Sequence, residues 1–407
     1  MGRAALGGAR SLTPPWAMRV ALVHDWLTGM RGGERVFERI ARFFPGAPIH
    51  TLVWNKGSVS AELESHPIVT SFLQHLPGAA TRYRWYLPLF PRAIESFDLS
   101  GYDAVVSSSH AVAKAVITRP GVPHLSYVNT PMRYIWDLEQ QYFPPERFPG
   151  PLGMYVRATC ARLRVWDRAT ASRPTKILGN SAFIVDRIRR CWGRESQPLH
   201  PSVEVERFVV GEGSRDYYLL AGAFAPYKRL DLALEAFRLL RRPVLVVGGG
   251  QDEAHLHALA PPGVTFRAGV TDSELVAIYA GARALIFPGE EDFGIMPVEA
   301  MAAGTPVIAF GRGGALETVG RGADAASLAG VAAGGIARVP GGMLFGTQTA
   351  EAIADAVRAF ERESFSPHEL ARLAQPFSGK RFDTELRAAL INAGIPPQDG
   401  GETEARP

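Results

Sequence analysis

The sequence has very little cysteine: Cys160 and Cys191 are the only two among 407 residues, and they do not have the spacing of metal ligands. So few thiols argue against a disulfide framework and fit a reducing compartment. The sequence also lacks any apolar run that approaches the roughly 18 residues of a membrane-spanning helix. We therefore expect a soluble, cytoplasmic protein.

A strong charge of either sign is missing as well. The formal net charge is +4, and no basic stripe has the spacing that reads a nucleic-acid groove, so nucleic acid is not an expected partner. One local cluster stands out, because basic, aromatic and apolar side chains follow one another between Arg82 and Pro91. It could rest on anionic lipid headgroups at the inner face of the membrane. Alternatively, its arginines could be solvated above core aromatics.

A second basic group is spread along the chain at helical spacing. It consists of Arg157, Arg162, Arg164 and Arg168. This pattern is typical of a solvated helix face.

The length of 407 residues is too great for one ordinary core and predicts two domains of about 150–200 residues. In the first half we expect a buried strand over residues 19–24, a loop with several glycines and a helix over residues 34–44. Short strands are expected over residues 102–107 and 124–128. This alternation of strands and helices predicts α/β layers with a parallel sheet.

The same pattern restarts in the second half of the chain. Strands are expected over residues 217–221, 244–247, 264–266, 284–287 and 306–310, with a helix over residues 230–240. The join is expected near residues 201–213, where proline, glycine and charge interrupt the periodicity. Because ligands of open parallel sheets bind beyond the carboxyl ends of the strands, we expect the functional site in a cleft between the two domains.

The strongest chemical signal is a pair of glutamates around a predicted helix start. Glu291 follows the strand over residues 284–287. Pro297 predicts a helix that begins near it and ends at Gly304, which places Glu299 in the first turn. Carboxylates accept paired hydrogen bonds from sugar or ribose hydroxyls. Two alternatives stay open: an acid that merely suits the helix dipole at Glu299, and a general acid and base for sugar hydrolysis.

The backbone between these glutamates offers a seat for phosphate. The amides of Gly294, Ile295 and Met296 point out of the expected helix start, where free N–H groups and the helix dipole favour an anion. A nucleotide-sugar requires hydroxyl acceptors beside such a seat.

Two further features suit an anionic ligand. Lys228 stands between a strand and a helix, where its charge could neutralise a departing diphosphate; a lysine there could equally be an ordinary surface residue. Gly32 and Gly33 let the backbone approach a ligand closely, although glycine-rich turns between strand and helix are common.

Together these residues resemble the retaining glycosyltransferases of family 4, over roughly Met18 to Gly394. The resemblance rests on Gly32 to Glu34, Asn180-Ser181, Pro226 to Ala233, Glu291 with Glu299, Glu299 to Ala309, and Gly313 to Glu317. It implies an α/β protein of GT-B fold, in which two facing Rossmann-like domains with parallel sheets enclose a cleft.

The resemblance and the composition together set the expected domain limits. We expect a disordered extension over residues 1–17, an acceptor domain over 18–205 and a donor-binding domain over 206–375. A helix over residues 376–394 should cross back onto the first domain, followed by a disordered tail over 395–407.

The resemblance also assigns side chains to the donor. It implies that Glu299 binds the ribose hydroxyls, Glu291 binds the hydroxyls of the transferred sugar and Lys228 holds the diphosphate. Members of the family use no divalent metal and no cofactor besides the donor. The sugar keeps its anomeric configuration through front-face attack, and the leaving phosphate oxygen takes the proton of the acceptor.

Two backbone segments receive roles in the same way. Gly269 and Val270 are expected near the nucleobase, and Gly32 and Gly33 near the phosphate and the acceptor.

The sequence departs from the family pattern at two positions. Ala223 stands where an arginine commonly grips the phosphates, and Arg229 could compensate or could face outward. Asn129 stands where a histidine lies beside the reacting sugar; it can form hydrogen bonds but cannot titrate. His110 could replace that histidine, or it could be a structural residue with satisfied hydrogen bonds.

The resemblance is greatest to bacterial mannosyltransferase-like members that make polysaccharides or glycolipids. We expect a retaining hexosyltransferase that moves mannose from GDP-mannose, with a UDP-sugar as the next candidate, to a glycan or lipid-linked acceptor. The alternative is a catalytically lapsed module that binds nucleotide-sugars, which Ala223 and Asn129 favour. A nicotinamide-dependent oxidoreductase is disfavoured, because no Gly-x-Gly-x-x-Gly follows the first strand.

Overall fold

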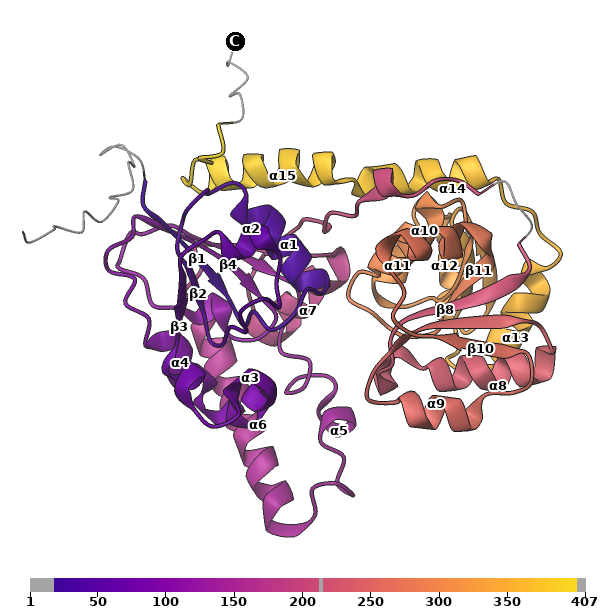
Figure 1. Cartoon of the computed structure of the whole chain (residues 1–407), viewed down its shortest axis with the longest axis horizontal. Helices are drawn as coiled ribbons and strands as arrows, with labels where there is room; N and C mark the ends of the chain where they lie inside the picture. The colour runs from indigo at the N-terminus through magenta and orange to yellow at the C-terminus, as the bar shows by residue number, and fades with distance from the viewer. Residues whose placement is uncertain (1–17, 212–214, 401–407) are drawn as a thin grey trace, which may run out of the picture.

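The computed structural model describes residues 18–211 and 215–400. Figure 1 shows two α/β domains side by side, each built around one sheet. The extension expected over residues 1–17, and residues 401–407 of the expected tail, lie outside the described residues.

The N-terminal sheet is fully parallel, with the strand order β3-β2-β1-β4-β5-β6-β7. Strands β1 and β5 are buried along their whole length, as expected for strands covered on both faces. The strands are β1 (Val20–His24), β2 (Ile49–Thr51), β3 (Ile68–Thr70), β4 (Ala104–Ser109), β5 (His124–Val128), β6 (Lys176–Gly179) and β7 (Gln197–Pro198).

Helices cover this sheet on both faces, and the longest of them is α6. The α-helices are α1 (Gly32–Ala41), α2 (Ala61–Glu64), α3 (Ala79–Arg82), α4 (Phe90–Glu95), α5 (Glu139–Tyr142), α6 (Gly150–Thr170) and α7 (Ala182–Trp192). The 3-10 helices of this domain are η1 (Phe72–His75), η2 (Tyr83–Leu89) and η3 (Ala113–Ala115), whereas η4 (Val205–Arg207) packs against the C-terminal core.

The C-terminal sheet has the order β10-β9-β8-β11-β12-β14-β13, and its pairs are parallel except for the edge strand β13. Its strands are β8 (Tyr217–Ala223), β9 (Val244–Gly249), β10 (Val264–Arg267), β11 (Ala282–Phe287), β12 (Val307–Phe310), β13 (Ile336–Val339) and β14 (Gly342–Phe345). Its α-helices are α8 (Leu230–Leu240), α9 (Glu253–Leu259), α10 (Asp272–Gly281), α11 (Ile295–Ala302), α12 (Ala325–Ala332) and α13 (Ala350–Phe360). The 3-10 helices are η5 (Pro226–Lys228), η6 (Gly313–Leu316) and η7 (Gln375–Phe377).

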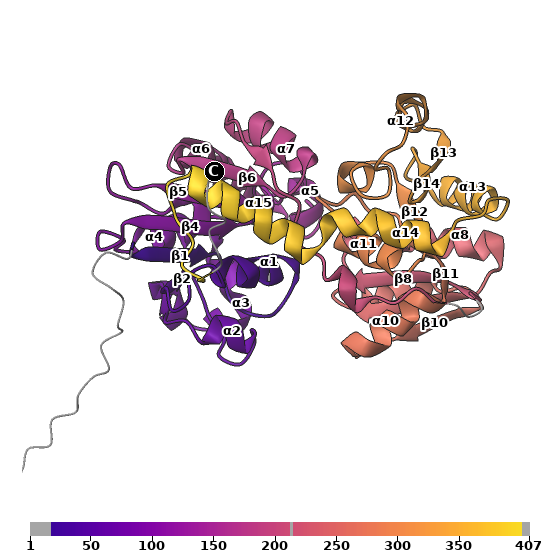
Figure 2. The same cartoon turned by 90° about the horizontal axis from the view of Figure 1, so that it is seen from above.

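Two helices at the end of the chain connect the domains. Figures 1 and 2 show α14 (Pro367–Ala374) lying on the C-terminal domain and α15 (Gly379–Asn392) lying across the N-terminal domain. Phe382, Leu386 and Leu390 of α15 are buried in the N-terminal core. Arg39 of α1 also donates to Asp383, with an Nε–Oδ1 distance of 2.6 Å.

The expected α/β class with two Rossmann-like parallel-sheet domains is confirmed. The expected domain limits stay a prediction. The first helix begins at Gly32, two residues before the expected start at Glu34. The Glu34 carboxylate accepts a hydrogen bond from the backbone N–H of Arg31 (3.1 Å), and this contact fixes the earlier start.

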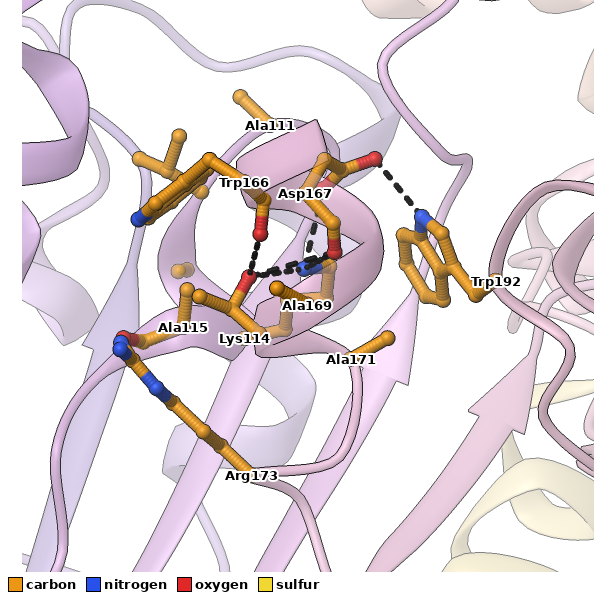
Figure 3. A network of polar contacts seen from close by, with 12 residues as sticks. Ala111, Lys114, Ala115, Trp166, Asp167, Ala169, Ala171, Arg173 and Trp192 are labelled. Carbon is orange, nitrogen blue, oxygen red and sulfur yellow. Dashed lines mark hydrogen bonds and ion pairs between the residues drawn. The ribbon is translucent and has the colours of Figure 1, made fainter. Parts of the chain in front are cut away.

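A buried ion pair joins η3 to α6. The Lys114 ammonium is fully buried, 3.0 Å from Oδ1 of Asp167. The other oxygen of Asp167 accepts hydrogen bonds from the indoles of Trp136 (2.8 Å) and Trp192 (2.7 Å). Figure 3 shows Lys114 below the end of α6, with Trp192 on the other side of Asp167. Burial lowers the pKa of Lys114, and the neighbouring Asp167 opposes that shift.

We predict that Lys114→Met destabilises the protein by about 3–5 kcal/mol, because it leaves the Asp167 carboxylate buried without its cation. Urea unfolding followed by circular dichroism measures this free energy. The exposed Lys56→Met in the same domain is the control and should change stability by less than about 0.5 kcal/mol. Equal stability of the two variants would contradict the importance of the pair.

Candidate active site

Lys228 and Glu291 meet at the carboxyl ends of two neighbouring strands. Lys228 ends η5, which follows β8, and Glu291 lies in the loop after β11. Strands β8 and β11 are adjacent at the centre of the sheet, where the direction of strand order reverses. The Lys228 ammonium forms an ion pair with Oε1 of Glu291. Burial opposes its charge, but Glu291 and Tyr227 outweigh this effect and hold the pKa of Lys228 above its ordinary value.

Helix α11 begins beside this ion pair, at Ile295, two residues before Pro297. The expected place of Glu299 in the first turn is therefore wrong, since Glu299 lies in the second turn. Pro297 is tolerated in the first turn because a backbone N–H there has no acceptor within the helix. Gly294 precedes the helix with a φ of 88°, a conformation that suits glycine. The predicted phosphate seat at Gly294, Ile295 and Met296 is thus a true helix start.

Glycines on both sides allow close packing around this helix start. A Cβ atom on Gly32 of α1 would lie 3.1 Å from Cδ1 of Ile295, which brings the N-terminal domain against α11. A Cβ atom on Gly222 of β8 would lie 3.0 Å from Sδ of Met296 and 3.6 Å from Nζ of Lys228. The start of α11 therefore lies between Lys228 and the first helix of the other domain.

Glu299 lines a cleft of about 240 Å³ between the domains. Its Oε2 accepts a hydrogen bond from the Tyr279 hydroxyl (3.0 Å). Burial raises the pKa of the Glu299 carboxyl. The side chains of both domains that line the cleft are Met30, Arg35, Glu38, Arg39, Arg42, Ser202, Val203, Glu204, Asp272, Ile295 and Glu299.

The N-terminal wall of the site gathers Gly33, Asn129 and His110. A Cβ atom on Gly33 would lie 3.8 Å from Nδ2 of Asn129 and 3.9 Å from Nδ1 of His110. Asn129 donates to the Ser108 hydroxyl (3.2 Å). His110 follows β4 and Asn129 follows β5, so both stand at the carboxyl ends of adjacent strands.

Asp25, which the sequence did not single out, organises this wall. Its two carboxylate oxygens accept four backbone hydrogen bonds at 2.6–2.9 Å, from residues 110–113. One of these oxygens also lies 3.3 Å from Nδ1 of His110. Burial lowers the pKa of His110, although Asp25 opposes the shift. The contact with Asp25 supports a structural role for His110, and its place beside Asn129 supports a role as substitute for the family histidine. Both alternatives stay open.

Asp292, next to Glu291, joins the two domains. Its carboxylate pairs with Arg133 (Nη2–Oδ2 2.6 Å) and with Arg187 (Nη1–Oδ1 2.9 Å), and all three side chains are largely shielded from solvent. Arg133 also lies over the Tyr227 ring, 5.3 Å from its centroid. The sequence alone assigned Asp292, Arg133 and Arg187 no role, because the partners are far apart in the chain.

Residues 313–317 support the same loop. A Cβ atom on Gly313 would lie 2.3 Å from the carbonyl oxygen of Glu291, and the Gly314 N–H donates to that oxygen (2.8 Å). The Glu317 carboxylate accepts from the first N–H groups of α7, at Ala182 (2.7 Å) and Phe183 (2.9 Å). The segment therefore fixes the Glu291 loop and caps a helix of the other domain.

Arg229, Gly269 and Val270 are the remaining predicted donor-binding residues. Arg229 pairs with Asp231, two residues on, with an Nη2–Oδ2 distance of 3.1 Å, and its role in place of an arginine at Ala223 stays a prediction. Gly269 and Val270 follow the edge strand β10, and Val270 packs against the C-terminal core. Their proximity to a nucleobase stays a prediction.

The C-terminal half of the chain matches a family model. The family is described as glycosyl transferases group 1, and the match covers residues 202–375. Residues 202–375 are therefore similar to a glycosyltransferase group 1 domain. This region contains Lys228, Glu291 and Glu299, whereas the N-terminal wall of the site lies outside it.

Curated relatives align with part of the chain. D-inositol 3-phosphate glycosyltransferase of Streptomyces bingchenggensis is 32% identical over 34% of this chain and 38% of that protein. GDP-mannose-dependent alpha-(1-6)-phosphatidylinositol monomannoside mannosyltransferase of Mycolicibacterium smegmatis is 29% identical over 53% of this chain and 61% of that protein. O-antigen chain mannosyltransferase RfbU of Salmonella typhimurium is 29% identical over 35% and 43%. The chain thus spans less than two thirds of each of these relatives.

Solved structures match nearly the whole chain. Anabaena HepE in complex with UDP and glucose has a TM-score of 0.62 at 14% identity, over 92% of this chain and 99% of that one. Sucrose-phosphate synthase from Thermosynechococcus elongatus has a TM-score of 0.65 at 16% identity, over 92% and 99%. These matches confirm the expected GT-B fold.

The described residues contain neither a candidate membrane-spanning helix nor a candidate metal site. Over residues 18–211 and 215–400, no helix combines the length and the apolar character needed to cross a membrane. In the same part of the chain, no group of three or more histidine, cysteine, aspartate or glutamate side chains is arranged to hold a metal ion.

We predict that Asp292→Ala loosens the contact between the domains, because it leaves Arg133 and Arg187 without their shared carboxylate. The free energy of unfolding should fall by about 3 kcal/mol, and small-angle scattering should report a larger radius of gyration. Asp355→Ala, which removes an exposed pair within α13, is the control. An unchanged radius and stability in Asp292→Ala would refute the role of this contact.

Proposed function

We propose that the chain is a metal-independent retaining glycosyltransferase that transfers a sugar from a nucleotide-sugar donor. The observation that carries the proposal is the Lys228–Glu291 ion pair beside the free amides of α11, at the strand ends and next to the Glu299 cleft. These groups suit the three parts of a nucleotide-sugar: ribose, diphosphate and sugar.

The chemistry follows from the charges of the site. The bond between the anomeric carbon and the diphosphate oxygen breaks, and negative charge develops on that oxygen. The protonated Lys228 and the N–H groups of Gly294, Ile295 and Met296 stabilise this charge without a metal ion. The acceptor hydroxyl attacks from the same face and gives its proton to the departing phosphate oxygen. Glu291 would exchange its ion pair for hydroxyl groups of the sugar.

The donor and acceptor are proposed from the relatives. Two relatives are named as mannosyltransferases, one of them GDP-mannose-dependent, which supports GDP-mannose as the donor. A UDP-sugar is the second choice, because the HepE structure holds UDP and glucose. The relatives' names include a phosphatidylinositol mannoside and an O-antigen chain, which supports a glycolipid, glycan or lipid-linked acceptor.

An enzyme with such an acceptor would work in the cytoplasm at the inner face of the membrane. The segment between Arg82 and Pro91 stays a candidate contact with that membrane. Its Arg82, Arg84 and Trp85 side chains are exposed, whereas Tyr83 is buried.

The alternative is a module that binds nucleotide-sugars without transfer. It is favoured by Asn129 in the wall of the site and by Ala223, and Arg229, which could compensate for Ala223, pairs with Asp231. Donor binding without nucleotide release would support this alternative.

The test is nucleotide release from a panel of nucleotide-sugars, in EDTA, with and without a membrane lipid extract. We expect release from one donor, GDP-mannose first, and faster release when the extract supplies an acceptor. The proposal would be wrong if the protein bound none of the donors and released nucleotide from none of them. Release that requires an added divalent metal would refute the role of Lys228 and the α11 amides.

We predict that Glu299→Ala mainly weakens donor affinity, by about 10- to 100-fold, because one charged hydrogen-bond acceptor is lost. Glu291→Ala should lower kcat as well, since the transferred sugar and Lys228 both lose a partner. Titration calorimetry and steady-state kinetics separate the two effects. Glu235→Ala, an exposed glutamate on α8, is the control. If both variants kept the donor kinetics of the control, the assignment of the site would be wrong.

A further inference from the structure

Helix α6 has two apolar faces, of which the fold uses one. The inner face contains Cys160, Leu163 and Asp167, which are buried against the N-terminal core. The ion pair of Asp167 with Lys114 fixes the C-terminal end of the helix in the domain (Figure 3). The N-terminal end projects beyond the neighbouring elements (Figure 1). The helix is therefore rigidly held and displays its other face outward.

The outer face carries a continuous apolar stripe. Met154, Ala158, Ala161 and Val165 are spaced three or four residues apart, so they line up along one side of the helix. All four are exposed, with 66% of Met154 and 72% of Val165 accessible to solvent. The nearby Tyr155, on the flank of the stripe, is exposed as well. Large apolar side chains gathered in this way mark an interaction site.

Positive charge flanks the stripe on both sides. By helical periodicity, Arg157 and Arg168 lie along one edge and Arg162 along the other, and all three are exposed. The one acidic residue between positions 150 and 170 is Asp167, whose charge is buried with Lys114. The outer face is thus apolar at its centre and cationic at its margins, with no acid of its own.

We infer that the outer face of α6 docks onto the surface of an anionic lipid bilayer. The apolar stripe would enter the boundary between headgroups and acyl chains, and the long arginine side chains would extend to the lipid phosphates. This is the pattern of a helix that lies in the plane of a membrane surface without crossing it. The proposal concerns a different segment from residues 82–91 and does not rest on the proposed glycosyl transfer.

The charges argue against a second copy of the chain as the occupant. A symmetric dimer through this stripe would bring the same arginines of two copies together, and no acidic partner stands on the face to compensate. An anionic surface removes this repulsion and satisfies the arginines.

The proposal is tested by co-sedimentation of the full chain with vesicles of phosphatidylcholine alone or of equal parts phosphatidylcholine and phosphatidylglycerol. We expect binding to the anionic vesicles, weakened by salt. Each arginine near such a surface adds about fivefold to partitioning, so the triple change Arg157→Gln, Arg162→Gln and Arg168→Gln should reduce binding about 100-fold. The matched control changes three exposed arginines of the C-terminal domain to glutamine, at Arg358, Arg362 and Arg372.

A labelled variant reports on insertion of the stripe. The emission of a polarity-sensitive dye on Val165→Cys should shift to the blue on anionic vesicles. The emission of the same dye on Leu239→Cys, also exposed but on α8, should not shift. The native Cys160 and Cys191 are buried and should not take the dye.

Several outcomes would overturn the inference. They are absence of binding to anionic vesicles, equal binding by the α6 variant and the control, or loss of binding only when Arg82 and Arg84 are changed to glutamine. If light scattering gave the α6 variant a different molar mass from the native chain, while vesicle binding stayed the same, the face would be identified as a contact between copies. If the α6 variant lost binding to duplex RNA but kept its binding to vesicles, the face would be identified as a nucleic-acid surface.

Discussion

The ion pairs of Asp292 with Arg133 and Arg187 join the two domains within the loop that forms the candidate active site. On one side of Asp292 in the chain is Glu291, which pairs with Lys228. On the other side, Gly294 starts the helix whose amides can receive a phosphate. The position of both groups therefore depends on how the N-terminal domain holds this one carboxylate. The proposed glycosyl transfer would need such a link, because the donor and acceptor would approach from different domains.

The same segment shows why the loop has little freedom. Gly313 and Gly314 touch its backbone at distances that no side chain would permit, and Glu317 caps α7 of the other domain. Charged groups buried at such a junction are costly when unpaired, so each needs its partner in place. The arrangement favours one position of the loop over many, which suits a site that must present fixed charges to a diphosphate.

The sequence predicted local structure well where a single segment decided it. The helix over residues 230–240 is α8, and the strand expected over residues 124–128 is β5. Pro297 does lie in the first turn of α11, but the helix begins two residues before it, at Ile295, so Glu299 falls in the second turn and not in the first. Interactions between distant segments could not be predicted in this way. Arg187 and Asp292 are 105 positions apart, and Asp25 binds backbone groups 85 to 88 positions away. Only folding brings these groups together, so their spacing carries no signal in the sequence.

The central claim is that the start of α11, Lys228 and Glu299 together hold a nucleoside diphosphate. A crystal structure of the full chain with GDP or UDP tests this most directly. The account predicts that the diphosphate contacts Lys228 and the N–H groups at the start of α11, with the ribose hydroxyls on Glu299. Nucleotide bound elsewhere on the chain, or no nucleotide in the cleft at saturating concentration, would contradict it.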